Sequence, residues 1–164
     1  MSDLEVLQFI SLKMLYAVIC GAIVGYERRV NHAPAGFKTQ ILVCVGAMLF
    51  TVSPTIAGPL MAGETPRVIG QIVTGVGFLG AGSIIHNKTH SVSGLTTAAW
   101  IWFTAAIGIF IGLEHGPVAL FITVTLTGVI VITRKIEKKY FSYQQASQES
   151  ATDEENRAKF RKAG

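Results

Sequence analysis

The fold is decided by residues 89–133, which read THSVSGLTTAAWIWFTAAIGIFIGLEHGPVALFITVTLTGVIVIT. Glu114 is the only Asp, Glu, Lys or Arg in this stretch, so it separates two uncharged runs, 89–113 and 115–133. A helix needs roughly 20 mostly apolar residues to cross a hydrocarbon core of about 30 Å. We therefore predict two consecutive transmembrane helices with a short turn between them.

Three further windows extend this pattern toward the N-terminus. Residues 39–63 and 68–87 also lack Asp, Glu, Lys and Arg, and residues 6–26 contain only Lys13. The N-terminus is acidic, which argues against a cleaved signal peptide. We expect an all-α membrane protein with about five transmembrane helices. Their predicted bounds are 6–26, 39–58, 67–86, 94–113 and 116–134.

The composition excludes several classes of protein. Charged residues make up 15% of the 164 residues, against about 25% in soluble domains. This deficit argues against a soluble globular domain, a disordered chain and a nucleic-acid-binding domain. Residues 141–164 differ, because they hold four acids and four bases. We expect a transmembrane domain over residues 1–140 and a polar cytoplasmic tail over residues 141–164.

The basic residues predict an orientation. If the chain has five spans, eight Lys and Arg residues near the span ends fall on one side of the membrane. Membrane proteins carry their excess of Lys and Arg in short cytoplasmic loops, so we expect this side to be cytoplasmic. The N-terminus is then outside and the C-terminus cytoplasmic. These residues are Arg28, Arg29, Lys38, Lys88, Arg134, Lys135, Lys138 and Lys139.

Two charges need a separate explanation. Glu27 is an acid on the basic side, and we expect it to pair with Arg28, Lys38 or Lys88, as a structural ion pair or as part of a functional site. Lys13 lies inside a span, where a charge is costly in lipid. We expect its side chain to extend toward the outer face.

Glycine spacing predicts close helix packing. Gly21 and Gly25 are four residues apart in the first span, and Gly108 and Gly112 in the fourth. Small residues at this spacing let helix backbones approach closely in lipid. We therefore expect both pairs to lie at helix–helix contacts.

The third predicted span contains more glycine than the other spans. Its glycine content is compatible with two structures. The span is either a central helix packed by several neighbours, or a glycine-loosened helix whose freed carbonyls coordinate a cation in a cavity. Gln71, Thr74 and Ser83 are polar groups that would contribute to such a cavity. Its glycines are Gly70, Gly75, Gly77, Gly80 and Gly82.

The sequence indicates no enzyme active site and no bound cofactor. His86 and His90 are four residues apart but lie in a predicted loop without a nearby carboxylate or thiol, so whether a metal binds stays open. Cys20 and Cys44 lie inside spans, where cysteine behaves mostly as a small apolar residue.

Several motifs, in order and with compatible spacing, resemble the MgtC/SapB family of bacterial inner-membrane proteins. They are GAIVGYER at 21–28, PAGFKT at 34–39, GAMLF at 46–50, QIVTGVGFLGAG at 71–82 and VSGLTTAAW at 92–100. The resemblance implies a multi-pass inner-membrane protein that is not an enzyme and is associated with growth in low magnesium. Family members that resemble the virulence factor carry a folded cytoplasmic domain after the last helix. In this sequence the predicted transmembrane domain is followed only by the polar residues 141–164. We therefore expect this chain to belong to the shorter, SapB-like branch.

The candidate functional residues come from this resemblance, with Thr74 added because of its place in the third span. We expect a regulatory protein that binds other membrane proteins; the alternative is a small ion transporter or channel, with Mg²⁺ as a candidate ion. The expected partners are the lipid bilayer, other membrane proteins and, as an open alternative, further copies of this chain, but not nucleic acid. The candidates are Glu27, Arg28, Gly36, Lys38, Thr39, Gln71, Thr74, Gly75, Gly77, Gly80, Gly82, Gly94, Thr96 and Thr97.

Overall fold

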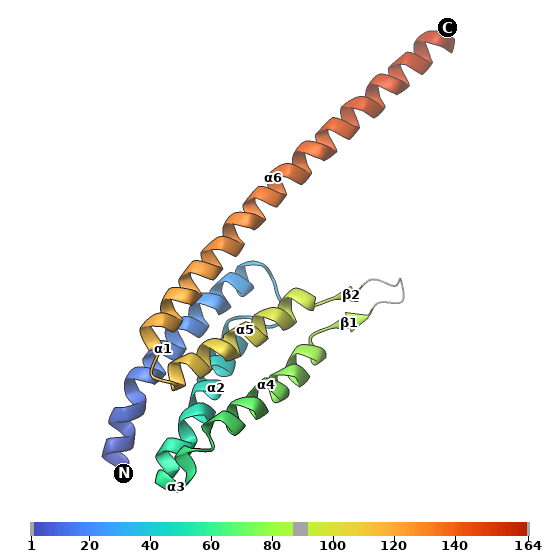
Figure 1. Ribbon diagram of the computed structural model, residues 1–164. Helices are drawn as coiled ribbons and strands as arrows, with labels where there is room; N and C mark the ends of the chain where they lie inside the picture. Colours follow the sequence, from blue (N-terminus) through green and yellow to red (C-terminus); the bar gives the residue numbers. More distant parts are fainter. Residues whose placement is uncertain (1, 87–91, 164) are drawn as a thin grey trace. The chain divides into compact units, whose positions relative to one another are not determined.

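The computed structural model describes the backbone of residues 2–86 and 92–163 (Figure 1). The regular structure of this part is helical apart from one antiparallel pair of two-residue strands, in which Ile85 lies opposite Ser93. The elements are α1 (Asp3–Val30), α2 (Phe37–Ala57), α3 (Pro59–Ala62), α4 (Thr65–Gly82), β1 (Ile85–His86), β2 (Val92–Ser93), α5 (Leu95–Gly112) and α6 (Gly116–Ala163).

The chain divides into two compact units, Met1–Thr127 and Gly128–Gly164. The boundary falls inside α6, so the second unit is the continuation of that helix. The first unit contains all the other elements and the start of α6. The sites described below lie in this first unit.

The prediction of an all-α membrane protein is confirmed. Within the described residues, four helical segments are long and apolar enough to cross a membrane: α1, α2, α5 and residues Gly116–Tyr140 of α6. The predicted third span forms α4, which has 18 residues but is not among those four. Arg67, Gln71 and its many glycines lower its mean hydropathy. A fifth crossing and the orientation of the termini stay predictions.

Helix α2 lies at the centre of the first unit, between α1 and α5. A Cβ built on Gly21 of α1 would lie 2.7 Å from the Cα of Ile41, and one built on Gly25 would lie 2.7 Å from the Cα of Phe37. Side-chain carbon cannot fit at these distances, so the two helix backbones are in direct contact. The predicted contact through this glycine pair is confirmed.

The second glycine pair makes the matching contact on the other side of α2. A Cβ on Gly108 of α5 would overlap the carbonyl oxygen of Cys44, and one on Gly112 would lie 2.6 Å from the Cβ of Thr51. Both residue numbers rise together along the contact, so α2 and α5 run in the same direction. Helices α2 and α5 therefore begin at the same end of the unit.

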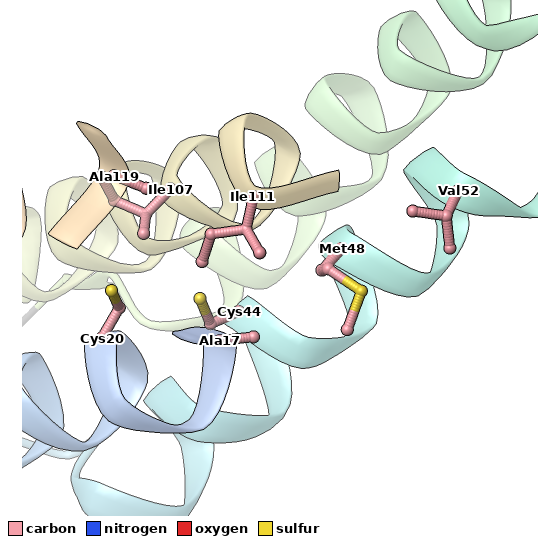
Figure 2. Packing of buried hydrophobic residues seen from close by; sticks show 8 residues of the cluster. All are labelled: Ala17, Cys20, Cys44, Met48, Val52, Ile107, Ile111 and Ala119. Carbon is pink, nitrogen blue, oxygen red and sulfur yellow. The ribbon is translucent and has the colours of Figure 1, made fainter. Parts of the chain in front are cut away.

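Small and sulfur-containing side chains fill the space between these helices (Figure 2). Cys20 and Cys44 are free thiols and are fully buried, as expected for cysteines that act as small apolar residues. Met48 is also fully buried beside them. The cluster comprises Ala17, Cys20, Cys44, Met48, Val52, Ile107, Ile111 and Ala119, from α1, α2, α5 and α6.

Candidate functional site

A buried ion pair closes the C-terminal turn of α1. The side chains of Glu27 and Arg28 are 5% and 3% exposed. The Arg28 guanidinium donates from Nε to Glu27 Oε2 at 2.5 Å and from Nη2 to Glu27 Oε1 at 2.9 Å. Two parallel hydrogen bonds of this kind are the strong geometry for an arginine and a carboxylate. The two charges therefore neutralise each other inside the fold.

Two neighbours complete this cluster. Asn31 donates from Nδ2 to Glu27 Oε1 at 2.7 Å and to the Glu27 carbonyl oxygen at 2.7 Å. The Arg28 guanidinium also lies 5.1 Å from the ring centroid of Trp100, within the range of a cation–π interaction. The cluster therefore ties the end of α1 to α5. Of the three expected partners of Glu27, the structure places Arg28 there; Lys38 is exposed at the start of α2, and Lys88 lies outside the described residues.

A second buried charge lies in the N-terminal half of α1. Lys13 is 6% exposed, and its Nζ lies 2.7 Å from Oε1 of Glu114 in the turn between α5 and α6. The ammonium also lies 3.5 Å from the Phe9 ring centroid and donates to the Phe9 carbonyl oxygen at 3.2 Å. The Lys13 side chain thus extends toward the N-terminal end of α1 and ends on an exposed acid, but the lysine itself is buried. That this end faces the outside of the membrane stays a prediction.

Both interpretations of the glycine-dense third span are wrong. Helix α2, and not α4, is the central helix, and α4 is unbroken over Thr65–Gly82, so it frees no run of carbonyls. Of its glycines, Gly80 alone has a neighbour among the described residues, with a built Cβ 3.6 Å from the Cβ of Ala98. Four of its glycines meet nothing within 4 Å in the described structure: Gly70, Gly75, Gly77 and Gly82.

A groove of about 580 Å³ runs between α2 and α4. It brings together three predicted site residues, Thr39, Gln71 and Gly75. Gly46 lies in the α2 wall, and built Cβ atoms on Gly46 and Gly75 meet only open space. The rest of the lining is apolar: Leu42, Val43, Ala47, Phe50, Val68, Ile72, Val76 and Leu79.

The other predicted site residues do not join one centre. Gly36 and Gly94 precede α2 and α5 as N-caps. Gly94 has φ +92°, and a Cβ there would overlap the Ser83 carbonyl oxygen, so this position requires glycine. Thr97 is buried and Thr96 is exposed. Thr74 is exposed on α4, and its hydroxyl donates to the Gly70 carbonyl oxygen at 3.0 Å.

Sequence reasoning missed four residues that the tertiary structure singles out. Asn31 follows Glu27 by one helical turn, a spacing that could have indicated the contact. Trp100 lies in the motif at 92–100 and Glu114 is the one charge between two uncharged runs, but neither pattern indicated its partner, and no sequence signal pointed to Gln40. Gln40 is fully buried in α2 and donates from Nε2 to the Ala35 carbonyl oxygen at 3.3 Å, while its Oε1 has no partner among the described residues.

Among the described residues, no group of three or more His, Cys, Asp and Glu side chains could hold a metal ion. His90 and the side chain of His86 lie outside the described part of the structure, so the predicted loop pair is not placed. The interior instead holds charges that pair with each other, with small residues between them.

The comparisons with known proteins agree with the motifs. The family model of the MgtC family matches residues 14–139. The chain is 37% identical over 128 residues to Protein MgtC of Salmonella typhimurium, covering 78% of this chain and 54% of the relative. It is 39% identical over 119 residues to Protein MgtC of Brucella abortus, covering 70% and 48%.

An uncharacterized protein of Haemophilus influenzae is 39% identical over 107 residues, 61% of this chain and 45% of that protein. The chain thus spans about half the length of the curated relatives that it matches. No solved structure matches it significantly. The family model covers most of the chain, and the protein belongs to the MgtC family.

Proposed function

We propose that this chain is a non-enzymatic protein of the bacterial inner membrane that regulates other membrane proteins by binding them. Its role is linked to magnesium limitation, as the family resemblance implies. Family membership supports this proposal only for the helical part that the chain shares with its relatives. The argument for partner binding comes from the surface of α4.

The outer face of α4 carries the proposal. Gly70, Thr74, Gly77 and Ala81 are all exposed, and their spacing puts them on one side of the helix. The glycine pairs of α1 and α5 are covered by the backbone of α2. The α4 stripe has the same kind of residues and no covering helix in the described structure. A transmembrane helix of another protein would fit it, because small residues permit close helix contact in lipid.

The arrangement of buried charges argues against ion transport. Glu27 lies in the last turn of α1 and Lys13 in its N-terminal half, about 21 Å apart at 1.5 Å per residue. Each is already paired, with Arg28 and Glu114. Buried acids in proton and ion pathways form connected series, whereas the α1 face between these two pairs is occupied by Ala17, Cys20 and Val24.

A small ion transporter or channel is the second candidate, because Thr39 and Gln71 both line the α2–α4 groove. Mg²⁺ prefers oxygen ligands in octahedral geometry and usually keeps several waters. Two polar side chains in an otherwise apolar groove offer few such ligands. The groove therefore favours an apolar occupant over a hydrated cation.

Site-specific photo-crosslinking in cells tests the regulatory proposal. A photoreactive amino acid at Thr74 should crosslink to a discrete membrane protein during growth in low magnesium. Gly77→Leu, on the same face, should abolish the product and the low-magnesium growth phenotype. Gly46→Leu, on the α2 wall of the groove, is the matched control and should retain the product. Crosslinking that is equal in the two variants contradicts the proposal.

Ion flux into liposomes that contain only the purified protein tests the second candidate. We expect no Mg²⁺ flux above that of empty liposomes under any gradient. Flux that Glu27→Gln or Gln71→Ala abolishes would reverse the ranking of the two candidates. The two experiments use different readouts, so each function can fail independently.

A further inference from the structure

We propose that the α2–α4 groove holds one acyl chain of an anionic phospholipid, whose headgroup phosphate lies at Lys38 and Thr39. This inference does not depend on the regulatory proposal, because the groove and the α4 stripe are different faces. Gly75 lines the groove, whereas Gly70 and Gly77 do not.

The lining of the groove suits a hydrocarbon chain. The groove runs from Thr39 to Phe50 along α2, about 16 Å at 1.5 Å per residue. Apart from Thr39 and Gln71, its lining residues are apolar or glycine. Built Cβ atoms on Gly46 and Gly75 meet open space, so a flexible acyl chain can lie between the two helices.

The length of the groove matches one leaflet. The hydrocarbon core is about 30 Å thick, so each leaflet contributes about 15 Å. Helix α4 returns alongside α2 after α3 (Figure 1), and its lining residues run from Val68 to Leu79, again about 16 Å. One acyl chain that enters at the start of α2 has the length to reach the other end of the groove, at Phe50 and Val68.

The charge at the ends of the groove selects the headgroup. Lys38 is exposed and precedes Thr39, which lines the groove at its α2 start. Exposed Arg29 lies at the same end, because Gly25 of α1 packs on Phe37. Glu27 adds no net negative charge there, since Arg28 neutralises it.

The first turn of α2 has no acidic residue. At the other end, Glu64 and Arg67 form an ion pair with each other at 3.0 Å. The excess of positive charge is therefore at the Lys38 end, and basic residues near the membrane surface attract anionic headgroups. This asymmetry sets which way the lipid would lie.

Native mass spectrometry of the full-length protein tests the inference, with dioleoylphosphatidylglycerol and dioleoylphosphatidylcholine as probes. We expect one retained lipid per chain, with the anionic probe preferred. Lys38→Gln should lower that preference about fivefold, since one basic residue near the surface is worth about 1 kcal/mol. Gly75→Leu should remove the retained lipid by filling the groove.

Gly70→Leu is the matched control, because it adds the same side chain to α4 outside the groove, and it should retain the lipid. Gly46→Leu fills the groove from the α2 wall and replaces Gly75→Leu if that variant does not fold. The inference is overturned if both groove variants retain the lipid as Gly70→Leu does. Equal binding of the two probes, or a copurified polypeptide in place of the lipid, also overturns it.

Discussion

The glycines of α1 and α5 and those of α4 look alike in sequence and have opposite surroundings. Built Cβ atoms on Gly21, Gly25 and Gly112 come within 3 Å of α2. Those on Gly70 and Gly77 meet nothing within 4 Å in the described structure. The first set lies in helix contacts inside the chain, and the second set lies on a face that no other described helix covers.

The difference shows what small-residue spacing does and does not predict. The spacing predicts that a helix can be approached closely, but it does not say whether the approaching helix belongs to the same chain. For α1 and α5 the approaching helix belongs to the same chain, since both helices pack on α2. For α4, the chain itself supplies no covering helix among the described residues. Substitutions in the packed interior should therefore lower stability more than substitutions on the open face of α4.

Glu27→Ala should have the largest effect on stability. It leaves the 2%-exposed Arg28 without its carboxylate, and removing one partner of a buried ion pair typically costs 3–5 kcal/mol. We expect a loss of about that size in the free energy of unfolding, measured by denaturant titration in detergent micelles. Arg29→Ala changes an exposed charge on the same turn and should stay within about 0.5 kcal/mol. Equal losses in the two variants would show that the Glu27 pair is not structural.

Gly108→Ala should come next. Its Cβ would overlap the Cys44 carbonyl oxygen, and overpacking of this kind typically costs about 1–3 kcal/mol. The same titration measures the loss. Gly77→Ala is the matched control, because it adds the same methyl group on the open face of α4. If Gly108→Ala is as stable as the control, α2 and α5 are not in backbone contact.

Removing either member of the Lys13–Glu114 pair should lower stability, but by different amounts. Glu114→Gln leaves a buried ammonium without its carboxylate, and we expect a loss of about 1–3 kcal/mol, the cost of an unsatisfied buried group. Lys13→Met removes the buried charge and leaves Glu114, which is 64% exposed, in contact with water, so its cost should be under about 1 kcal/mol. Thermal unfolding of the two variants measures the order. The reverse order would place Lys13, and not Glu114, at the surface.

Gly77→Ala should have the smallest effect on the free energy of unfolding of the isolated chain. It should raise this free energy, whereas the other substitutions lower it. Alanine favours a helix over glycine by up to about 1 kcal/mol, and the built Cβ meets open space. We therefore expect a gain of up to that size in the free energy of unfolding in micelles. A loss above about 1 kcal/mol would mean that α4 is already covered, by a second copy of the chain, in the purified protein.

Much of the helical order was predictable from sequence, because it depends on local composition. Uncharged windows of membrane-spanning length predicted the helices, and the spacing of Gly21, Gly25, Gly108 and Gly112 predicted two close contacts. Glu27 and Arg28 are adjacent, so their pairing was among the expected alternatives. Fewer features of the site could be predicted. Lys13 pairs with an acid far away in the chain, and no local pattern encodes such a contact.

The third span marks the limit of reasoning from composition. Its glycines favoured either a packed central helix or a broken one. Helix α4 is neither, because it is continuous and has one face open. Glycine content reports only that side chains are absent. What replaces them depends on the rotation of α4 against its neighbours, which a single helix does not encode.

By itself, the sequence determined that this chain crosses a membrane, that its helices can pack closely, and that it resembles the MgtC/SapB proteins. The tertiary structure alone decided that α2 is central, that Gln40 and Lys13 are buried, and that one face of α4 and one groove stay open. The physical reason is range. Hydropathy and spacing act within one helix, whereas burial depends on which faces of separate helices meet.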